Sequence, residues 1–416
     1  MSTSTAIIGG GLVGLTTAFF LTEAGAEVTV LDQGTLGGGA ARGNSGFMCT
    51  TMITPLAGPG AITSAIRSFR DPTRALRVHL GQVPRMAPWF ARFALAATAR
   101  KHHEGSAALV GLNRGMHEAL RALTDGGVEA ALGKEILVPF HDEANATKFA
   151  KEMSDLAALV GLPTMIMLDG DGLRRLVPAL TDHVRAGFVM SGDRSIDPRK
   201  YVDSLITVLR ARGVKFVENT RIERFEHANG RITRVQSDAG TIEADEFVLS
   251  AGAGLQQLGR QLSLHLPIVA GQGYNVALPT TSELDRPVIF EEAHAVASPF
   301  DDRIRLGGTM EFAGNQPTFD GRRVDAIITS MRRFLNLDWG ARSDTWAGSR
   351  PMSPDGLPLL GRPSGWSNLT IAGGHGMYGL SLAPTSGRAI AELIVHGSSS
   401  IDLRPFNPNR FRLRFR

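Results

Sequence analysis

The sequence predicts an α/β fold with two domains, one Rossmann-like and built from discontinuous segments, the other α+β with an antiparallel sheet. A glycine-rich turn joins a buried strand to a helix at the N-terminus, and strands running into small residues recur in the middle and at the end of the chain. Between positions 266 and 312, short strands alternate with polar turns, which is typical of an antiparallel sheet. A length of 416 residues fits two domains of roughly 200 residues each.

Composition excludes several classes of protein. With 43% hydrophobic and 20% charged residues, the chain is neither disordered, nor collagen-like, nor a multi-span membrane protein. A single cysteine, Cys49, excludes an internal disulfide framework and favours a reducing cytoplasm. The net charge of +4 is spread along the chain without a basic arm, so we expect no nucleic-acid partner. No histidine or cysteine spacing suits a metal, so we expect no metal site.

The first 32 residues carry the most specific pattern. We expect a buried strand over 5–8, the G-x-G-x-x-G turn Gly9–Gly14, a helix over 12–24 and a second strand over 27–31 that ends in Asp32. This order of elements distinguishes a dinucleotide-binding unit from an isolated glycine-rich turn or a plain βαβ unit.

Each residue of that pattern has a physical role. Gly9 makes the turn, Gly11 lets the backbone approach a pyrophosphate, and Gly14 lets the helix pack closely on the strand. The helix N-terminus favours negative charge. Asp32 can accept hydrogen bonds from the ribose hydroxyls of an ADP moiety, which argues against the 2′-phosphate of NADP. This pattern does not distinguish FAD from NAD as the bound dinucleotide.

Hydrophobic periodicity and turn residues predict the remaining elements. Asp197 suits a helix N-cap, with Pro198 in the first helical position. Pro384 fits only the first turn of the last helix. The predicted helices are two or three within 60–125 (one over 83–99) and others over 142–160, 173–180, 199–212, 324–335 and 382–396. The predicted strands cover 135–140, 214–217, 221–227, 231–237, 246–250, 268–278, 288–290, 295–299, 304–308 and 369–372.

Seven motifs carry a resemblance to a known family. They are Ile7–Gly14, Val30–Asp32, Ile196–Pro198, Ala244–Ala253, Gly348–Pro351, Asp355–Gly361 and Gly374–Gly376. On these motifs the chain resembles the FAD-dependent D-amino-acid dehydrogenase/oxidase family and looks most like the bacterial D-amino-acid dehydrogenases. The resemblance implies a Rossmann-like FAD-binding domain and a substrate domain whose antiparallel sheet covers the flavin. The expected division is 1–58, 187–262 and 341–403 for FAD, 59–186 and 263–340 for substrate, and 404–416 as a C-terminal tail.

The resemblance also implies which residues hold the cofactor, with the loop after the second strand lying along flavin and pyrophosphate. The expected FAD-binding residues are Gly9, Gly11, Leu12, Val13, Gly14, Asp32, Gln33, Ala41, Arg42, Asn44, Ser45, Gly46, Ile222, Ala251, Gly252, Gly374, Gly376, Met377, Gly379 and Leu380. Cys49 could tether the flavin covalently. We expect instead a buried thiol that packs as a small apolar side chain, and non-covalent FAD.

Four residues are candidates for the chemistry. By resemblance, Arg350 in Gly-x-Arg-Pro is the carboxylate clamp, and a guanidinium suits a bidentate pair with a carboxylate. Its alternative is a surface salt bridge. Tyr274 and Tyr378 would flank the flavin, or be core aromatics with satisfied hydroxyls. His375 is expected to be structural, in a turn whose backbone amides and following helix N-terminus face the flavin pyrimidine, with a catalytic acid/base role as the alternative.

The implied activity is oxidative deamination of a D-amino acid, with cyclic ones such as D-proline or hydroxyproline included. The α-hydrogen leaves as hydride to flavin N5, the resulting imine hydrolyses to a 2-oxo acid, and electrons pass to a quinone or other acceptor. The alternatives are an O₂-using oxidase of glycine- or sarcosine-type amines, a non-catalytic FAD-binding protein and a NAD-dependent dehydrogenase.

The tail after Arg404 alternates cations with aromatic residues, up to Arg416. Such a pattern can contact an anionic membrane from the cytoplasmic side, where a quinone resides. The alternative is a tail that packs on the protein or frays. We therefore expect a cytoplasmic protein, with this tail as the candidate for peripheral membrane contact.

Overall fold

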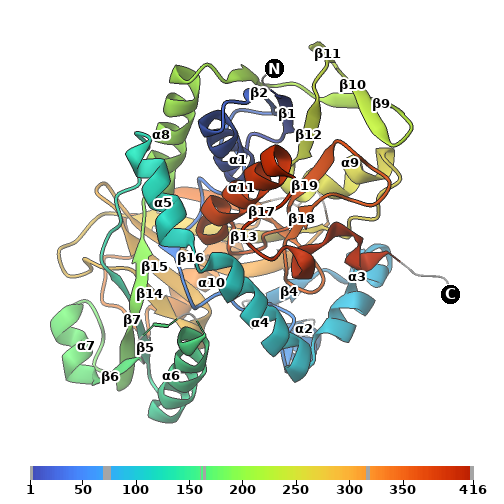
Figure 1. Cartoon of the computed structure of the whole chain (residues 1–416). Coiled ribbons are helices and arrows are strands. Elements are labelled where there is room, and N and C mark those ends of the chain that lie inside the picture. The colour runs from blue at the N-terminus through green and yellow to red at the C-terminus, as the bar shows by residue number, and fades with distance from the viewer. Residues whose placement is uncertain (1–2, 69–75, 160, 163–164, 315–318, 413–416) are drawn as a thin grey trace.

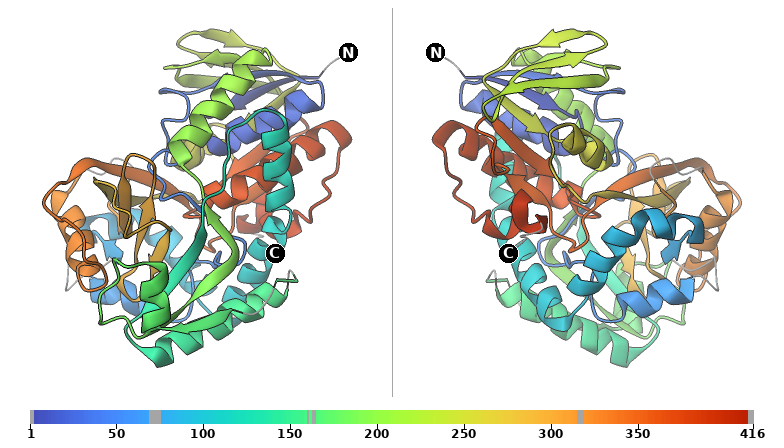
Figure 2. Two further views of the ribbon diagram at one scale, coloured as in Figure 1. Left: turned by 90° about the vertical axis from the view of Figure 1, so that its left-hand side faces the viewer. Right: turned by 90° about the vertical axis from the view of Figure 1, so that its right-hand side faces the viewer.

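The computed structural model describes residues 3–68, 76–159, 161–162, 165–314 and 319–412. Two large sheets lie next to each other, as Figures 1 and 2 show. The first has six strands, which are parallel except for β18. Their order across the sheet is β18 (Leu359–Gly361), β19 (Leu369–Gly373), β12 (Glu246–Leu249), β1 (Ser4–Ile8), β2 (Glu27–Leu31) and β8 (Lys215–Val217). Strands from the start, middle and end of the chain thus make one sheet, as predicted.

Helices α1 (Leu12–Glu23) and α11 (Gly379–His396) pack on this sheet, and α8 (Pro198–Ala211) packs on α1. Asp197 caps α8 as predicted, because its carboxylate accepts a hydrogen bond from the Arg199 amide at 2.9 Å. Helix α11 begins at Gly379, earlier than predicted, so Pro384 lies inside the helix and not in its first turn. Helix α1 packs closely on α11 next to this proline, and the Thr16 hydroxyl of α1 donates to the Ala383 carbonyl at 3.0 Å.

The second sheet is larger and mostly antiparallel. Its main path is β17 (Ser343–Met352), β13 (Val269–Leu278), β16 (Ile304–Phe312), β15 (Ala295–Pro299), β14 (Val288–Phe290), β5 (Glu135–Phe140), β7 (Ala186–Ser195) and β3 (Phe47–Met48). Two short strands join it from the side, β4 (Leu76–Val78) on β16 and β6 (Ile166–Asp169) on β7. Strands β3, β7 and β17 belong to this sheet, although the division expected from sequence places most of their residues with the first.

Besides the short η1 turn (Leu80–Gln82), the described part of the segment 61–125 contains four helices, where two or three were predicted. They are α2 (Ala61–Ser68), α3 (Val83–Ala96), α4 (Ala99–Asn113) and α5 (Met116–Asp125). The predicted helix over 83–99 ends early because Thr98 caps a new helix, its hydroxyl accepting from the Lys101 amide at 3.3 Å. The other described helices are the η2 turn (Gly252–Gly254), η3 (Glu291–Ala293), α6 (Glu143–Ala158), α7 (Gly170–Leu176), α9 (Leu255–Gln261) and α10 (Gly321–Met331). A small antiparallel sheet of β9 (Ile222–Ala228), β10 (Arg231–Ser237) and β11 (Gly240–Ile242) completes the fold.

The C-terminal segment packs on the protein as far as it is described. Two short turns, η4 (Arg404–Phe406) and η5 (Pro408–Phe411), contact β18. Phe406 is buried, and Arg410 makes hydrogen bonds of 2.7 and 3.0 Å to the Asp355 carboxylate. This geometry supports the packed alternative for residues 404–412. The rest of the tail that was predicted to contact a membrane, residues 413–416, lies outside the described residues. In the described part of the chain, no helix is both long and apolar enough to cross a membrane.

Candidate functional site

A cavity of about 2690 Å³ lies between the two sheets. One end is bordered by the carboxyl ends of β1, β2 and β12 and by Asp32, and the other by β13, β16 and β17 with Arg350. Ligands of parallel α/β sheets bind at such carboxyl ends. The cavity is therefore placed to hold a dinucleotide at one end and a small substrate at the other.

The glycine turn has the geometry that the sequence pattern requires. Gly9 has φ +118°, and a Cβ on it would lie 2.4 Å from the Ser250 carbonyl oxygen. A Cβ on Gly14 would lie 2.0 Å from the Gly9 carbonyl oxygen, so helix and turn are in close contact. A Cβ on Gly11 would meet no protein atom within 4 Å. Gly11 borders the cavity, so its missing side chain leaves open space next to the α1 N-terminus, which fits a pyrophosphate.

Asp32 lies at the end of β2 and borders the cavity. Its two carboxylate oxygens accept hydrogen bonds from the amides of Gly10 at 2.7 Å and Gly34 at 2.8 Å. Each oxygen keeps a further lone pair for a ribose hydroxyl. The carboxylate thus shapes the turn as well as facing the cavity, a second role that the sequence did not reveal.

Most of the residues expected to hold FAD border this cavity. They are Gly9, Gly11, Leu12, Val13, Asp32, Gln33, Ala41, Asn44, Ser45, Ile222, Ala251, Gly252, Gly376, Met377, Gly379 and Leu380. Gly14, Gly46 and Gly374 do not line it and shape the backbone behind it. Arg42 does not line it either, because its guanidinium forms an ion pair with Asp203.

Sequence reasoning missed Arg305, a buried arginine on β16 that supports the loop after β2. Its Nη1 donates to the carbonyls of Arg42 at 3.1 Å and Asn44 at 2.6 Å. Burial lowers the pKa of Arg305 to about 10, so the side chain stays charged at neutral pH. Sequence spacing cannot find such a residue, because it lies far from the loop along the chain.

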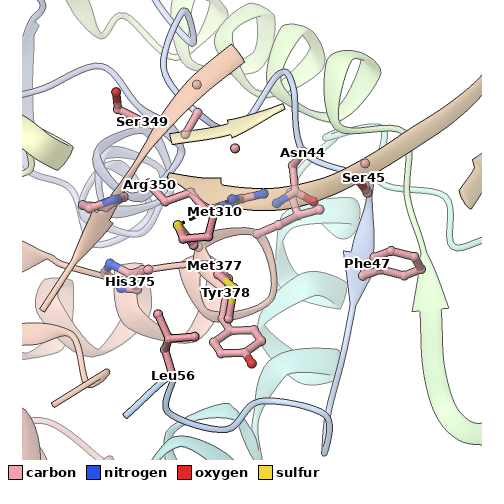
Figure 3. Close-up of a pocket in the computed structure, with 18 of the residues that line it drawn as sticks. Asn44, Ser45, Phe47, Leu56, Met310, Ser349, Arg350, His375, Met377 and Tyr378 are labelled. Carbon is pink, nitrogen blue, oxygen red and sulfur yellow. Dashed lines mark hydrogen bonds between the residues drawn. The ribbon is translucent and has the colours of Figure 1, made fainter. Parts of the chain in front are cut away.

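Arg350 on β17 points into the substrate end of the cavity (Figure 3). Its Nη1 donates to the Thr309 carbonyl at 2.9 Å and lies 3.8 Å from the Met310 sulfur. Among the described residues, no carboxylate lies within ion-pair distance of the guanidinium. Burial lowers its pKa to about 10, which leaves it charged at neutral pH. The surface-salt-bridge alternative does not apply to this half-buried cation.

A bulge in β16 brings Thr309 to the same place. The pairing of β13 with β16 shifts between Gln272 and Tyr274, and Thr309 has φ +61°. A β-branched residue in this region of backbone space is strained, and such strain concentrates at functional sites. The bulge turns the Thr309 carbonyl toward Arg350. The Thr309 hydroxyl is buried without a hydrogen-bond partner among the described residues, so it is available to a bound group. No local sequence pattern predicts this hydroxyl.

Tyr274 borders the cavity as a residue, but its side chain packs on the face of the sheet that carries α10. Successive strand residues point to opposite faces, and Gly273 and Asn275 face the cavity side, where they approach Arg350 and the Gly43 carbonyl. The Tyr274 side chain is buried in the apolar cluster around α10. Its hydroxyl donates to Glu311 at 2.5 Å. These contacts support the interpretation of Tyr274 as a core aromatic residue with a satisfied hydroxyl.

Tyr378 and His375, which precede α11, both border the cavity (Figure 3). The Tyr378 hydroxyl accepts from the Thr54 amide at 3.3 Å. Burial raises the pKa of Tyr378 to about 12, so it is neutral. His375 is buried, with Nε2 2.9 Å from the Ser386 hydroxyl of α11, and burial lowers its pKa to about 3. Because the imidazole is neutral and hydrogen-bonded to α11, a structural role for His375 is better supported than a role as a catalytic acid.

Cys49 is buried beside the cavity, and its amide donates to the Ser381 hydroxyl at 3.0 Å. Burial, with the charge of Asp193 next, raises the pKa of the thiol well above its usual value. A protonated thiol is a poor nucleophile. This environment is that of a packed apolar side chain, in keeping with the expectation of non-covalent FAD.

Comparisons with known proteins identify the family of this chain. A D-amino acid dehydrogenase of Methylobacterium nodulans is 33% identical over 407 residues, covering 93% of this chain and 94% of the relative. Glycine oxidase from Geobacillus kaustophilus has a similar fold, with a TM-score of 0.77, 19% identity and coverage of 98% and 99% of the two chains. L-proline dehydrogenase from P. horikoshii gives a TM-score of 0.74 at 20% identity, over 99% and 98%. A model of the family described as FAD dependent oxidoreductase (DAO) matches residues 4–393, and the chain therefore belongs to this family of FAD-dependent oxidoreductases.

Proposed function

We propose that this chain is an amino-acid dehydrogenase that oxidatively deaminates D-amino acids, giving an imine that water hydrolyses to a 2-oxo acid. The observation that carries the proposal is the half-buried Arg350 guanidinium, which has no anionic partner among the described residues and points into the cavity. The name of the relative from Methylobacterium nodulans supports the D-configuration.

FAD, when bound, accepts the two electrons and the α-hydrogen of the substrate as hydride. The residues that line the turn, the loop after β2 and the start of α11 would hold it. The first amides of α11, at Gly379 and Leu380, border the cavity. The positive end of this helix would stabilise negative charge on the reduced cofactor.

Arg350 would bind the substrate carboxylate in a bidentate pair and so fix the Cα–H bond relative to the cofactor. Gly273 makes this possible, since a Cβ there would lie 2.2 Å from the guanidinium carbon. Leu56, Met310 and Met377 form apolar walls around this end of the cavity (Figure 3). These walls would exclude water and strengthen the ion pair.

No strong base is needed in this scheme if the substrate amine binds deprotonated. The pKa of His375, about 3, makes its imidazole a weak base, and the Tyr378 hydroxyl stays protonated at pH 7, so neither is suited to take a proton from the substrate amine. We propose that Tyr378 shapes the pocket and that His375 fixes the turn before α11. Electrons would leave to a quinone or other acceptor.

The test is an anaerobic absorption spectrum of the purified holoprotein, before and after addition of D- and L-amino acids, D-proline, glycine and sarcosine. Bleaching of the flavin band by D-amino acids, followed by reoxidation with a quinone analogue, is the expected result. Bleaching by glycine or sarcosine, with peroxide release in air, would identify an oxidase instead. A flavin that no amine bleaches would overturn the proposal and favour a non-catalytic role.

A further inference from the structure

Glu291 is an unpartnered carboxylate in the same cavity as Arg350. It begins η3, the turn that joins β14 to β15, and its side chain is half-buried. The described residues offer it no hydrogen bond and no ion pair. The carboxylate of the next residue, Glu292, does have partners. It accepts hydrogen bonds from the His141 amide at 2.8 Å and from the Asn145 side chain at 3.0 Å. One carboxylate of the pair thus supports the fold, and the other faces open space.

The surroundings of Glu291 disfavour the charged form of its carboxylate. Burial raises the pKa of Glu291, the charge of His294 opposes this rise, and the charge of Glu152 adds to it. A carboxylate that is partly removed from water and has no partner is destabilised, and a cation brought to it would relieve this. The cations other than Arg350 that border the cavity, Lys148, Arg221 and Arg333, are exposed and therefore screened by water.

Glu291 also lies within electrostatic range of the substrate end. Burial is the main cause of the raised pKa of Tyr378, and the charge of Glu291 is a smaller one. Apolar side chains from elements next to Glu291 in the fold, among them Phe140 of β5, Phe149 of α6 and Ile289 of β14, also border the cavity. An aliphatic stem that ends in a cation is complementary to such an apolar wall with a carboxylate on it.

Building on the function proposed above, we propose that the preferred substrates are D-amino acids with a cationic side chain, such as D-arginine and D-lysine. The substrate carboxylate pairs with Arg350, and the side-chain cation pairs with Glu291. Glu291 is then the specificity-determining residue of the cavity. Its position in a short turn between two apolar strands gave no sequence signal.

The experiment compares D-arginine and D-lysine with the uncharged D-norleucine and D-methionine in the wild type, E291Q and E152Q. In E291Q, kcat/KM for the cationic substrates should fall by roughly 30-fold or more, as expected for loss of one partner of a desolvated ion pair. The uncharged substrates should stay within about twofold, because they make no such pair. E152Q removes a neighbouring exposed charge and is the matched control, with cationic substrates changed by less than about threefold. An equal loss for all substrates in E291Q would mean that this residue serves the α-amine and would overturn the proposal.

A binding measurement separates this inference from the proposed function. Valerate and 4-guanidinobutanoate both carry a carboxylate for Arg350 and lack an α-amine, and their binding perturbs the flavin spectrum. The guanidino compound should bind the wild type at least tenfold tighter than valerate, and E291Q should abolish that preference. Equal affinities in the wild type would overturn the inference even if D-amino acids are oxidised. A preference for the guanidino compound in a protein that oxidises no D-amino acid would refute the proposed function alone. The visible spectrum and melting temperature of E291Q serve as the folding control.

Discussion

The two ends of the cavity are built in different ways. At the cofactor end, β1, the glycine turn, α1, β2 and Asp32 follow one another along the chain. At the substrate end, Arg350 comes from β17, Thr309 from a bulge in β16, and Glu291 from a turn between β14 and β15. The first site depends on local backbone geometry, and the second depends on strand register and on which face each side chain takes. Substitutions can test whether the two ends also fail independently.

The largest effect should come from Arg350. Arg350→Ala removes the proposed carboxylate partner, and kcat/KM for every D-amino acid should fall by roughly 10³-fold or more. Arg350→Lys keeps the charge, but a lysine cannot form the bidentate pair, so a smaller loss is expected. FAD content should stay that of the wild type, because the cofactor end is not changed. Steady-state kinetics and the flavin-to-protein absorbance ratio measure both.

The matched control for Arg350 is Arg234→Lys, which changes an exposed arginine paired with Glu243. Its kinetics should equal those of the wild type. Loss of FAD from Arg350→Ala, rather than loss of turnover, would show that the two ends of the cavity are coupled and do not fail independently.

Gly11→Ala tests the cofactor end alone. A Cβ on Gly11 would meet no protein atom within 4 Å, and its φ of −76° suits alanine, so the apoprotein should fold normally. The methyl group would occupy the space next to the α1 N-terminus, and FAD affinity should fall by about tenfold or more. Titration of apoprotein with FAD, followed by flavin fluorescence, measures this.

Gly111→Ala is the control for the alanine substitution, since Gly111 is an exposed position inside α4 that a Cβ would not crowd. There, alanine should leave FAD affinity unchanged and raise stability slightly. An unchanged FAD affinity in Gly11→Ala would mean that the pyrophosphate does not lie against this turn.

Asp193 on β7 tests how the wall of the substrate end is held. Its carboxylate accepts a 2.6 Å hydrogen bond from the Thr50 amide, and Thr54 and Met52 further along that segment border the cavity. Burial raises the pKa of Asp193 from 3.8 to about 6, against the hydrogen bonds from Thr50. The folded state therefore binds a proton more tightly than the unfolded state, and this contribution to stability is lost as the pH rises from about 4 through about 6.

The difference in pKa corresponds to about 3 kcal/mol at most. Asp193→Asn removes the titration and keeps an oxygen that can accept from Thr50. Relative to the wild type, the variant should gain stability between pH 4 and pH 7. Chemical denaturation at several pH values in this window measures the difference. A wild type that instead gains stability over Asp193→Asn as the pH rises would show that this carboxylate is favoured in its charged form.

Local patterns explain what the sequence could predict and what it could not. The first strand, turn and helix follow from glycine spacing and alternation, and the Asn229–Gly230 hairpin follows from its turn residues. Arg350 was found because its motif is short and contiguous. Thr309 and Glu291 were missed because a bulge and a tertiary cavity give them their environment. These features depend on pairing between strands that are distant along the chain.

The side-chain direction of Tyr274 is another feature that local sequence patterns could not predict. Substitution of this residue should have the smallest effect on kcat/KM. A strand residue faces the cavity or the core according to the parity of its position, and parity follows from register rather than from composition. Tyr274→Phe should leave kcat/KM within about twofold, because its hydroxyl bonds to Glu311 on the side of the sheet that carries α10. Stability should fall by about 1–3 kcal/mol, because the buried Glu311 loses a donor. Kinetics and thermal unfolding distinguish a role in the core from a role in the active site. A loss of turnover at unchanged stability would show that Tyr274 acts in the active site.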